Sequence, residues 1–461
     1  MAILPSLSTL LPPPRSDLKP LSGTTTLTLL PALAPPLTYY LALLLLPPFP
    51  NTSSEPTARV IPFLRNSLAL LSGILFFRLP LKYHVPFSVG LTYQLALVGL
   101  YGGCRVLDAF FISPYLFQHI PRRVKYHHAP RTLAPSTPLG ADAKSCSSLH
   151  FLTPGDGEAV TETATTDEGW PHGWKDRISW ALELELSMRG AGFTWSSADV
   201  RHTKSTWRPS IRDRTHSILV HVLPILVVSW AVIRDIYSLN LANGEPFDDL
   251  PIGLQLVLTA ALGAFLMSAF SLGHSTFAIM LAPLAPHPLS YFPPLYTARV
   301  WELTSVRDFW SYGWHRLFSR LFLVYGVWPG EWLERKLTGK PDEEAADMGK
   351  VLGGFVSSAF VHSFAAHTVM GGWEGAFGEA WFFAGNGVAV VVEEGVRMAV
   401  VRYRRWQKRQ GAGDGKDEVG LERWYDGVIG RVWWVCVLLY MGRNFARGWV
   451  RAGLVREMAG L

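Results

Sequence analysis

Apolar stretches without any charged residue recur along the chain. The longest covers residues 250–298, where no Asp, Glu, Lys or Arg occurs. Because about 20 apolar residues in a helix cross the hydrocarbon core of a bilayer, this stretch alone is long enough to span it. The same property is shared by residues 21–54, 83–104, 215–233 and 351–373. The pattern predicts an all-α polytopic membrane protein and excludes a soluble, disordered or disulfide-stabilised one.

These stretches and their polar flanks predict about eight or nine transmembrane helices, with re-entrant or interfacial segments between them. Three prolines inside the first span shorten or kink it. In the third span, Arg105 and Asp108 lie three residues apart and are expected to pair. Residues 318–328 are too few to cross and are expected to be re-entrant. The spans are predicted at residues 27–46, 60–79, 86–112, 216–236, 252–270, 351–370, 380–396 and 428–445.

A polar break divides the chain. Residues 129–173 are rich in Pro, Ser, Thr, Gly and acidic side chains, from which no hydrophobic core can be built. After Trp174 apolar residues return at helical spacing beside charged ones, which predicts an amphipathic helix at the membrane surface. We therefore expect N-terminal transmembrane helices at 1–112, a mobile polar loop at 113–173 and a membrane core at 174–461.

The charged residues predict the orientation of the chain in the membrane. Only 17% of the residues are charged, against about 25% in soluble proteins. The net charge of +6 is small for 461 residues and is typical of Lys and Arg flanking membrane spans, so no nucleic-acid partner is expected. Basic loops occur at 120–126, 175–214, 299–340 and 397–409. Placing them in the cytosol fits every span predicted beyond residue 216, and we expect a multi-pass protein of the endoplasmic reticulum.

Two groups of polar and aromatic residues, in or next to the predicted spans, are candidates for a functional site. His362 lies near the middle of the charge-free span 351–370, and a titratable residue at that depth indicates a functional site by default. The alternative is a histidine that is hydrogen-bonded between helices, the role expected of His367 nearer the end of the span. Residues 305–315 combine aromatic, charged and histidine side chains, a composition that is also typical of an interfacial aromatic belt.

Both groups resemble motifs of the membrane-bound O-acyltransferase superfamily. Residues 358–364, Ser-Ala-Phe-Val-His-Ser-Phe, resemble its histidine motif. Residues 305–315, which begin Ser-Val-Arg-Asp-Phe-Trp and end Trp-His, are similar to the upstream aromatic motif of the wax-synthase-like branch. Residues 189–195, Arg-Gly-Ala-Gly-Phe-Thr-Trp, resemble an Arg-Gly-x-Gly-Trp-x-Trp element of that branch, and residues 382–393 resemble its post-histidine helix. The resemblance covers roughly residues 175–445, in the family's order.

Three positions depart from the family pattern. Phe193 replaces a tryptophan, and Ser363 stands where other branches often have glutamate. Residues 311–313, Ser-Tyr-Gly, replace a Gly-Arg-Arg-like triplet. This last departure removes positive charge from the side expected to meet the phosphates of acyl-CoA.

The resemblance implies a membrane-bound O-acyltransferase of the fungal secondary-metabolite type. It would transfer an acyl group, with acetyl favoured, from acyl-CoA to a hydroxyl of a lipophilic acceptor such as a terpenoid, with no bound cofactor or metal. His362 is the expected catalytic base, because an alcohol is a poor nucleophile while protonated. His315 is expected to orient or polarise the thioester carbonyl. The implied substrate-binding residues are Asp308, Phe309, Trp310, Trp314, Arg307 and Arg316.

Other functions compete with this interpretation. A wax synthase would transfer a long-chain acyl group to a long-chain alcohol with the same motifs. A transporter would also use a membrane-buried histidine, but it predicts paired half-helices and inverted repeats, and no internal repeat is visible in the sequence. A haem or diiron oxidoreductase would need histidines that face each other across helices, and stoichiometric iron in the purified protein would identify it.

Overall fold

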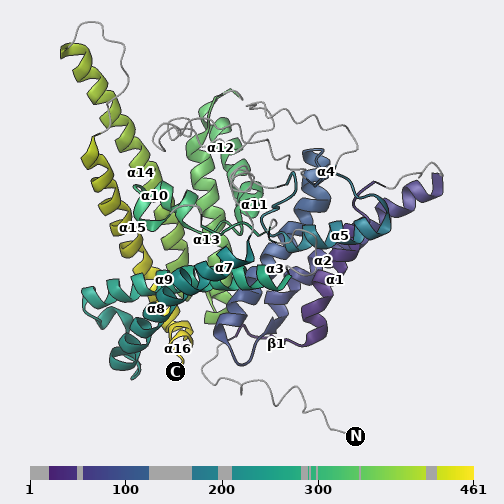
Figure 1. The fold of residues 1–461 in the computed structure, drawn as a ribbon, viewed down its shortest axis with the longest axis horizontal. Coiled ribbons are helices and arrows are strands. Elements are labelled where there is room, and N and C mark those ends of the chain that lie inside the picture. Colours follow the sequence, from purple (N-terminus) through teal and green to yellow (C-terminus); the bar gives the residue numbers. More distant parts are fainter. Residues whose placement is uncertain are drawn as a thin grey trace.

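Helices dominate the fold (Figure 1). The computed structural model describes residues 20–48, 55–123, 169–195, 210–281, 289, 292–296, 299–341, 344–411 and 423–461. The predicted mobile loop falls largely on residues 124–168, which lie outside the described residues. The longer helices are α1 Leu29–Leu44, α2 Glu55–Lys82, α3 Val89–Leu107, α5 Gly173–Leu186, α8 Leu223–Ile236, α9 Ile252–Leu281, α12 Trp328–Thr338, α13 Asp347–Met370, α14 Trp373–Gly411 and α15 Trp424–Arg451.

Short elements connect these helices. Strand β1 Thr25–Thr26 pairs in parallel with β2 Tyr83–His84, and so joins the segment before α1 to the end of α2. In Figure 1 the N-terminal helices gather on one side and the C-terminal ones on the other. Helices α14 and α15 run side by side and project beyond the other helices. The remaining short helices are α4 Ser113–Leu116, α7 Ile211–Ser217, α10 Val306–Asp308, α11 Ser319–Phe322 and α16 Leu454–Met458.

The helices confirm a multi-pass membrane protein. Five are long and apolar enough to cross a membrane, and each overlaps one predicted span: Val60–Lys82, Val89–Leu116, Ile211–Leu241, Ile252–Leu281 and Trp373–Gln407. The other three predicted spans form α1, α13 and α15. Helix α1 has only 16 residues and contains Pro35 and Pro36, in agreement with the predicted shortening. The total of eight or nine spans stays a prediction.

One predicted segment is longer than expected. In the segment 318–328, α11 continues through a π-helical segment, Leu323–Val327, directly into α12, and the re-entrant position stays a prediction. Pro329 lies in the first turn of α12. The wider π-helical turn directly before the proline accommodates its ring and its missing N–H, so the helix passes the point where the apolar pattern ends.

The amphipathic helix predicted after Trp174 is α5. Its Trp180 and Leu184 are fully buried against the N-terminal helices. Arg123 donates hydrogen bonds to Asp176 in the first turn of α5 and to Glu183 in its last turn, the latter at 2.7 Å. Burial alone would raise the pKa of Asp176, but the hydrogen bonds from Arg123 and from a backbone N–H hold this pKa below its usual value.

The predicted pairing of Arg105 with Asp108 is wrong. Arg105 extends from α3 to the C-terminal end of α5, where it donates to the carbonyl oxygens of Leu184 and Ser187. Asp108 accepts two hydrogen bonds from Arg320, at 2.7 and 3.1 Å. The cationic side chain is long enough to satisfy the unpaired carbonyls at the end of another helix, which a neighbour on its own helix cannot offer. The pair of Asp108 with Arg320 thereby fastens α3 to α11.

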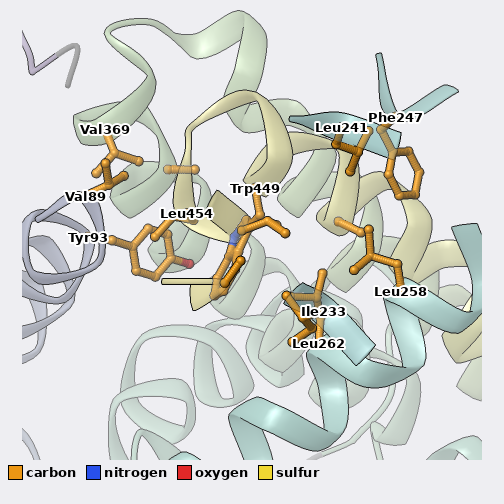
Figure 2. Packing of buried hydrophobic residues seen from close by; sticks show 14 of the residues in the cluster. Val89, Tyr93, Ile233, Leu241, Phe247, Leu258, Leu262, Val369, Trp449 and Leu454 are labelled. Carbon is orange, nitrogen blue, oxygen red and sulfur yellow. The ribbon is translucent and has the colours of Figure 1, made fainter. Parts of the chain in front are cut away.

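The largest buried cluster joins both halves of the chain (Figure 2). It contains residues from α3, α8, α9, α13, α14, α15 and α16. Tyr93 and Trp449 meet edge to face within it, with ring centroids 5.5 Å apart. Glu457 of α16 accepts a hydrogen bond from the backbone N–H of Val89 at 2.7 Å, which satisfies a free donor at the start of α3. Helix α3 is therefore held in register against α13 and α15.

Glycines let α12 and α13 touch backbone to backbone. Gly326 and Gly330 on one side face Gly349 and Gly353 on the other, and a Cβ atom on any of them would overlap a backbone carbonyl oxygen of the opposing glycine pair. Small residues four apart allow this close approach in membrane helices, where van der Waals packing stabilises association. The contact fixes the position of α13, the helix that carries His362.

Candidate active site

One cavity collects most of the residues that the sequence singled out. It has a volume of about 160 Å³ and lies between residues 305–323, α13 and α14. Six of the eight predicted site residues line it: Arg307, Trp310, Trp314, His315, Arg316 and His362. Asp308 and Phe309 do not contribute to the lining that the described residues form. Two motifs that are separate in the sequence thus share one chamber.

The aromatic segment, residues 305–315, is fixed at its start by hydrogen bonds. Ser305 is the N-cap of α10 and accepts from the backbone N–H of Asp308 at 2.8 Å. Glu393 of α14 accepts from the first two backbone N–H groups of α10, at 2.8 and 3.4 Å. A carboxylate at a helix N-terminus satisfies donors that have no helical partner. Glu393, in the predicted post-histidine helix, therefore holds the aromatic segment against α14.

Aromatic rings form one wall of the cavity. The indole N–H of Trp310 donates to the side-chain oxygen of Asn386 at 3.1 Å, and the Trp310 ring meets Phe355 edge to face at 5.7 Å. Phe309 points to the other side and stacks on Trp434, with centroids 5.6 Å apart. Phe309 thus supports the wall from behind, and Trp310 forms its inner surface.

Helix α13 presents His362 to the cavity. The imidazole stacks on Phe383 of α14, with ring centroids 4.3 Å apart and planes inclined by 20°. Its Nδ1 lies 3.1 Å from the hydroxyl of Tyr93, which in turn donates to Glu379 Oε2 at 2.8 Å. The indole N–H of Trp449 donates to the other oxygen of Glu379 at 2.8 Å. His362 is therefore oriented by contacts from α3 and α14, which lie on separate parts of the chain.

Tyr93 and Glu379 are functional-site candidates that the sequence pattern did not predict. Glu379 carried a signal, because it is a carboxylate directly before the predicted span 380–396, and its side chain is only 1% exposed. Burial of a carboxylate is unfavourable unless its oxygens are hydrogen-bonded. Tyr93 carried none, because a tyrosine in an apolar span does not show where its hydroxyl points.

The two other histidines differ in their surroundings. The ring of His315 lines the cavity and contacts Phe270 of α9 at 4.9 Å. Its Nδ1 is buried without a hydrogen-bond partner among the residues that the structure describes. Nδ1 of His367 is likewise buried without a partner among these residues, so it is the position on the cavity lining that distinguishes the two histidines. His367 lies outside the described lining and stacks on Trp373 at 4.4 Å, as suits a structural role.

Three cationic side chains line the cavity as well: Arg307, Arg316 and Lys350. Arg307 lies 3.6 Å from Glu394, and Lys350 lies 3.2 Å from Glu331. The sequence analysis did not single out Lys350, although it directly precedes the charge-free stretch that holds His362. Within the described part of the chain, no three His, Cys, Asp or Glu side chains gather as metal ligands. The chamber combines an apolar wall, two histidines and cations that suit an anionic group.

The element at 189–195 contacts the chain shortly before the aromatic segment. Arg189 is buried and donates to the backbone carbonyls of Pro293 and Pro294, the latter at 3.0 Å. Phe193, which stands where the related element has a tryptophan, is fully buried. The element thus anchors the proline-rich segment that leads into the aromatic segment.

Comparison with known proteins supports the resemblance drawn from the motifs. A family model described as the membrane bound O-acyl transferase family matches residues 292–385, the region that contains the aromatic segment and His362. This match confirms the resemblance. No solved structure matches the chain.

Similar proteins include two that are named acetyltransferases. One, from Rhodocybe pseudopiperita, is 24% identical over 273 residues, which is 59% of this chain and 66% of the relative. Another, from Hericium erinaceus, is 25% identical over 156 residues, or 32% of this chain and 40% of the relative. A protein named O-Mevalon transferase from Aspergillus niger is 27% identical over 161 residues, which is 31% of this chain and 35% of the relative. The chain therefore spans less than two thirds of each of these relatives.

Proposed function

We propose that this protein, whose residues 292–385 match the membrane-bound O-acyltransferase family, transfers an acyl group from acyl-CoA to a hydroxyl of a lipophilic acceptor. The observation that carries the proposal is the convergence of His315 and His362 on one cavity that cations also line. The transfer of an acyl group from the charged thioester to an apolar alcohol needs His315, His362 and the cationic side chains in one place. The bilayer is the expected source of the acceptor.

His362 is the general base of the proposed reaction. The acceptor oxygen attacks the thioester carbonyl carbon while His362 takes the hydroxyl proton, because an alcohol is a poor nucleophile when protonated. The carbon–sulfur bond then breaks, and His362 returns the proton to the departing sulfur. The products are an ester and the free thiol of CoA. Since a thioester is already activated, no covalent enzyme intermediate is required.

The other cavity residues bind and orient the substrates. His315 polarises the thioester carbonyl, where negative charge develops as the alcohol attacks. Arg307, Arg316 and Lys350 receive the phosphates of CoA, for which cationic side chains make strong hydrogen bonds. The apolar wall, with Trp310 and Trp314, encloses the reacting groups. We assign Asp308 and Phe309 to holding this wall in place, since both lie behind it.

The cavity supports a short acyl donor, in practice acetyl-CoA. A cavity of about 150 Å³ holds one benzene molecule, so a volume of about 160 Å³ has room for the acetyl group of the donor. Two similar proteins named as acetyltransferases favour the same donor. A terpenoid or another secondary-metabolite alcohol is the acceptor class that we propose.

Acyl selectivity provides a direct test. Microsomes that contain the protein, given equal acetyl-CoA and palmitoyl-CoA and a panel of terpenoid alcohols, are expected to form acetyl esters in excess by a factor on the order of 10². Phe355→Ala enlarges the cavity and should raise the palmitoyl share of the products, measured by mass spectrometry. Phe277→Ala, on the exposed side of α9, removes the same ring and should leave this ratio unchanged.

Two outcomes of this assay would contradict the proposal. If the unaltered protein used palmitoyl-CoA preferentially, its function would be that of a wax synthase and not that of an acetyltransferase. Absence of ester formation from both donors, with the protein present in the membrane, would contradict the acyltransferase function itself.

We infer that the protein resides in the endoplasmic reticulum with its basic loops in the cytosol, where acyl-CoA is available. An N-glycosylation acceptor inserted within residues 135–170 should then stay unmodified, whereas one inserted in the acidic loop 243–249 should be glycosylated. Gel mobility before and after glycosidase treatment measures both. Glycosylation at 135–170 would show that the basic loops are lumenal and contradict the inferred orientation.

A further inference from the structure

Three side chains behind His362 form a continuous hydrogen-bonded chain. The Tyr93 hydroxyl lies 3.1 Å from His362 Nδ1 and 2.8 Å from Glu379 Oε2, and Trp449 holds the second oxygen of Glu379 at 2.8 Å. We propose that Tyr93 and Glu379 are positioning residues that fix the tautomer of His362 and stabilise its protonated form during acyl transfer. The inference rests on the proposed function, because it gives His362 the role of base.

The direction of these hydrogen bonds follows from the chemistry of the groups. The indole of Trp449 can only donate, so one oxygen of Glu379 accepts from it. When Glu379 is ionised its oxygens can only accept, so the single proton of the Tyr93 hydroxyl is donated to the other oxygen of Glu379. Toward His362 the Tyr93 oxygen can then only accept, so Nδ1 carries a hydrogen. The lone pair of the imidazole is left on Nε2, which is the form that can take a proton from an alcohol.

In its ionised form, Glu379 can stabilise a protonated His362. The Glu379 side chain is 1% exposed, and in the described part of the chain its hydrogen-bond partners are the neutral side chains of Tyr93 and Trp449. Its oxygen lies 3.9 Å from His362 Nδ1. When His362 takes the acceptor's proton, the carboxylate becomes the nearest opposite charge in a site of low dielectric, which favours the imidazolium. The Nδ1 and Tyr93 protons keep their places throughout, so the chain orients and stabilises without transferring a proton.

Packing holds the chain rigid. Tyr93 is 5% exposed and meets Trp449 edge to face, while Phe383 stacks on the imidazole. The groups come from α3, α13, α14 and α15, so a complete arrangement requires that all four helices are in place. An orienting partner that is itself locked by packing keeps the base in its productive geometry before the substrate arrives.

The test compares Tyr93→Phe and Glu379→Gln with Tyr325→Phe as a matched control. Tyr325 also donates through its hydroxyl across helices, to the carbonyl of Cys104 at 2.8 Å. With protein amounts equalised in microsomes, Tyr93→Phe and Glu379→Gln should each lower kcat about 10- to 100-fold, the range for removing an outer partner of a functional histidine. The KM for acyl-CoA should stay within about twofold, because substrate contacts are unchanged. Tyr325→Phe should retain normal kcat.

A second measurement separates positioning from a general structural role. In a His362→Ala background, adding Tyr93→Phe should leave the residual rate unchanged, because residues that act as one unit are not additive. A structural role would lower the rate by the same factor in both backgrounds. Normal kcat in Tyr93→Phe and Glu379→Gln, or an equal further loss in the double variant, would overturn the inference. An unaltered protein without transferase activity would instead contradict the proposed function.

Discussion

His362→Ala is expected to lower ester formation by a factor on the order of 10² to 10⁴, the range for loss of a general base. The substitution removes a polar group from the apolar helix α13, so membrane insertion should not weaken. The measurement is the initial rate at saturating acyl-CoA, in membranes whose protein content has been equalised by immunoblot. A fall in rate with unchanged protein amount would support a chemical role for this side chain.

The other two histidines serve as comparisons within the same assay. His315→Ala should also reduce turnover, with a larger share of its effect in the KM for acyl-CoA, because His315 lines the cavity beside the cationic residues. His367→Ala should have the smallest effect, since its ring stacks on Trp373 outside the lining. Near-normal turnover in His362→Ala together with an inactive His367→Ala would mean that the base is His367 and not His362. Normal turnover in all three would contradict the proposed chemistry.

Gly353→Leu is expected to prevent correct folding, with a destabilisation on the order of 4 kcal/mol or more. A Cβ atom at Gly353 would overlap the carbonyl oxygen of Gly326 and lie 2.9 Å from its carbonyl carbon. The obstacle is backbone, which cannot rotate away as a side chain can, so α12 and α13 would have to separate. Thermal unfolding of the detergent-solubilised protein, followed by size-exclusion chromatography, measures the loss.

Gly263→Leu is the matched control for this substitution. Gly263 lies in the apolar helix α9, and a Cβ atom there would meet nothing within 4 Å. The same change in volume and hydrophobicity should therefore leave the unfolding temperature nearly unchanged. Equal destabilisation by both substitutions would show that the close contact of α12 with α13 is not the cause.

The sequence alone predicted the features that are determined by residues close together along the chain. Apolar stretches predicted the five helices that are long and apolar enough to cross a membrane, three of which correspond to charge-free stretches, because spanning requires only length and hydrophobicity. The aromatic segment and the histidine of α13 were recognisable as short local motifs. Both reach the same cavity. The predicted segment 318–328 ends where its apolar pattern ends, whereas the helix continues to Thr338 through charged residues that an apolar pattern does not include.

The tertiary structure decided which side chains meet across helices. Tyr93 contacts His362 over 269 positions of sequence, and Arg320 reaches Asp108 over 212, in place of the local partner expected for that carboxylate. Such contacts depend on the rotation of each helix about its axis and on the glycine contact that brings α12 against α13. Hydropathy determines that a segment is a membrane helix but leaves this rotation open. The residues that orient the base therefore became visible only when the helices were packed together.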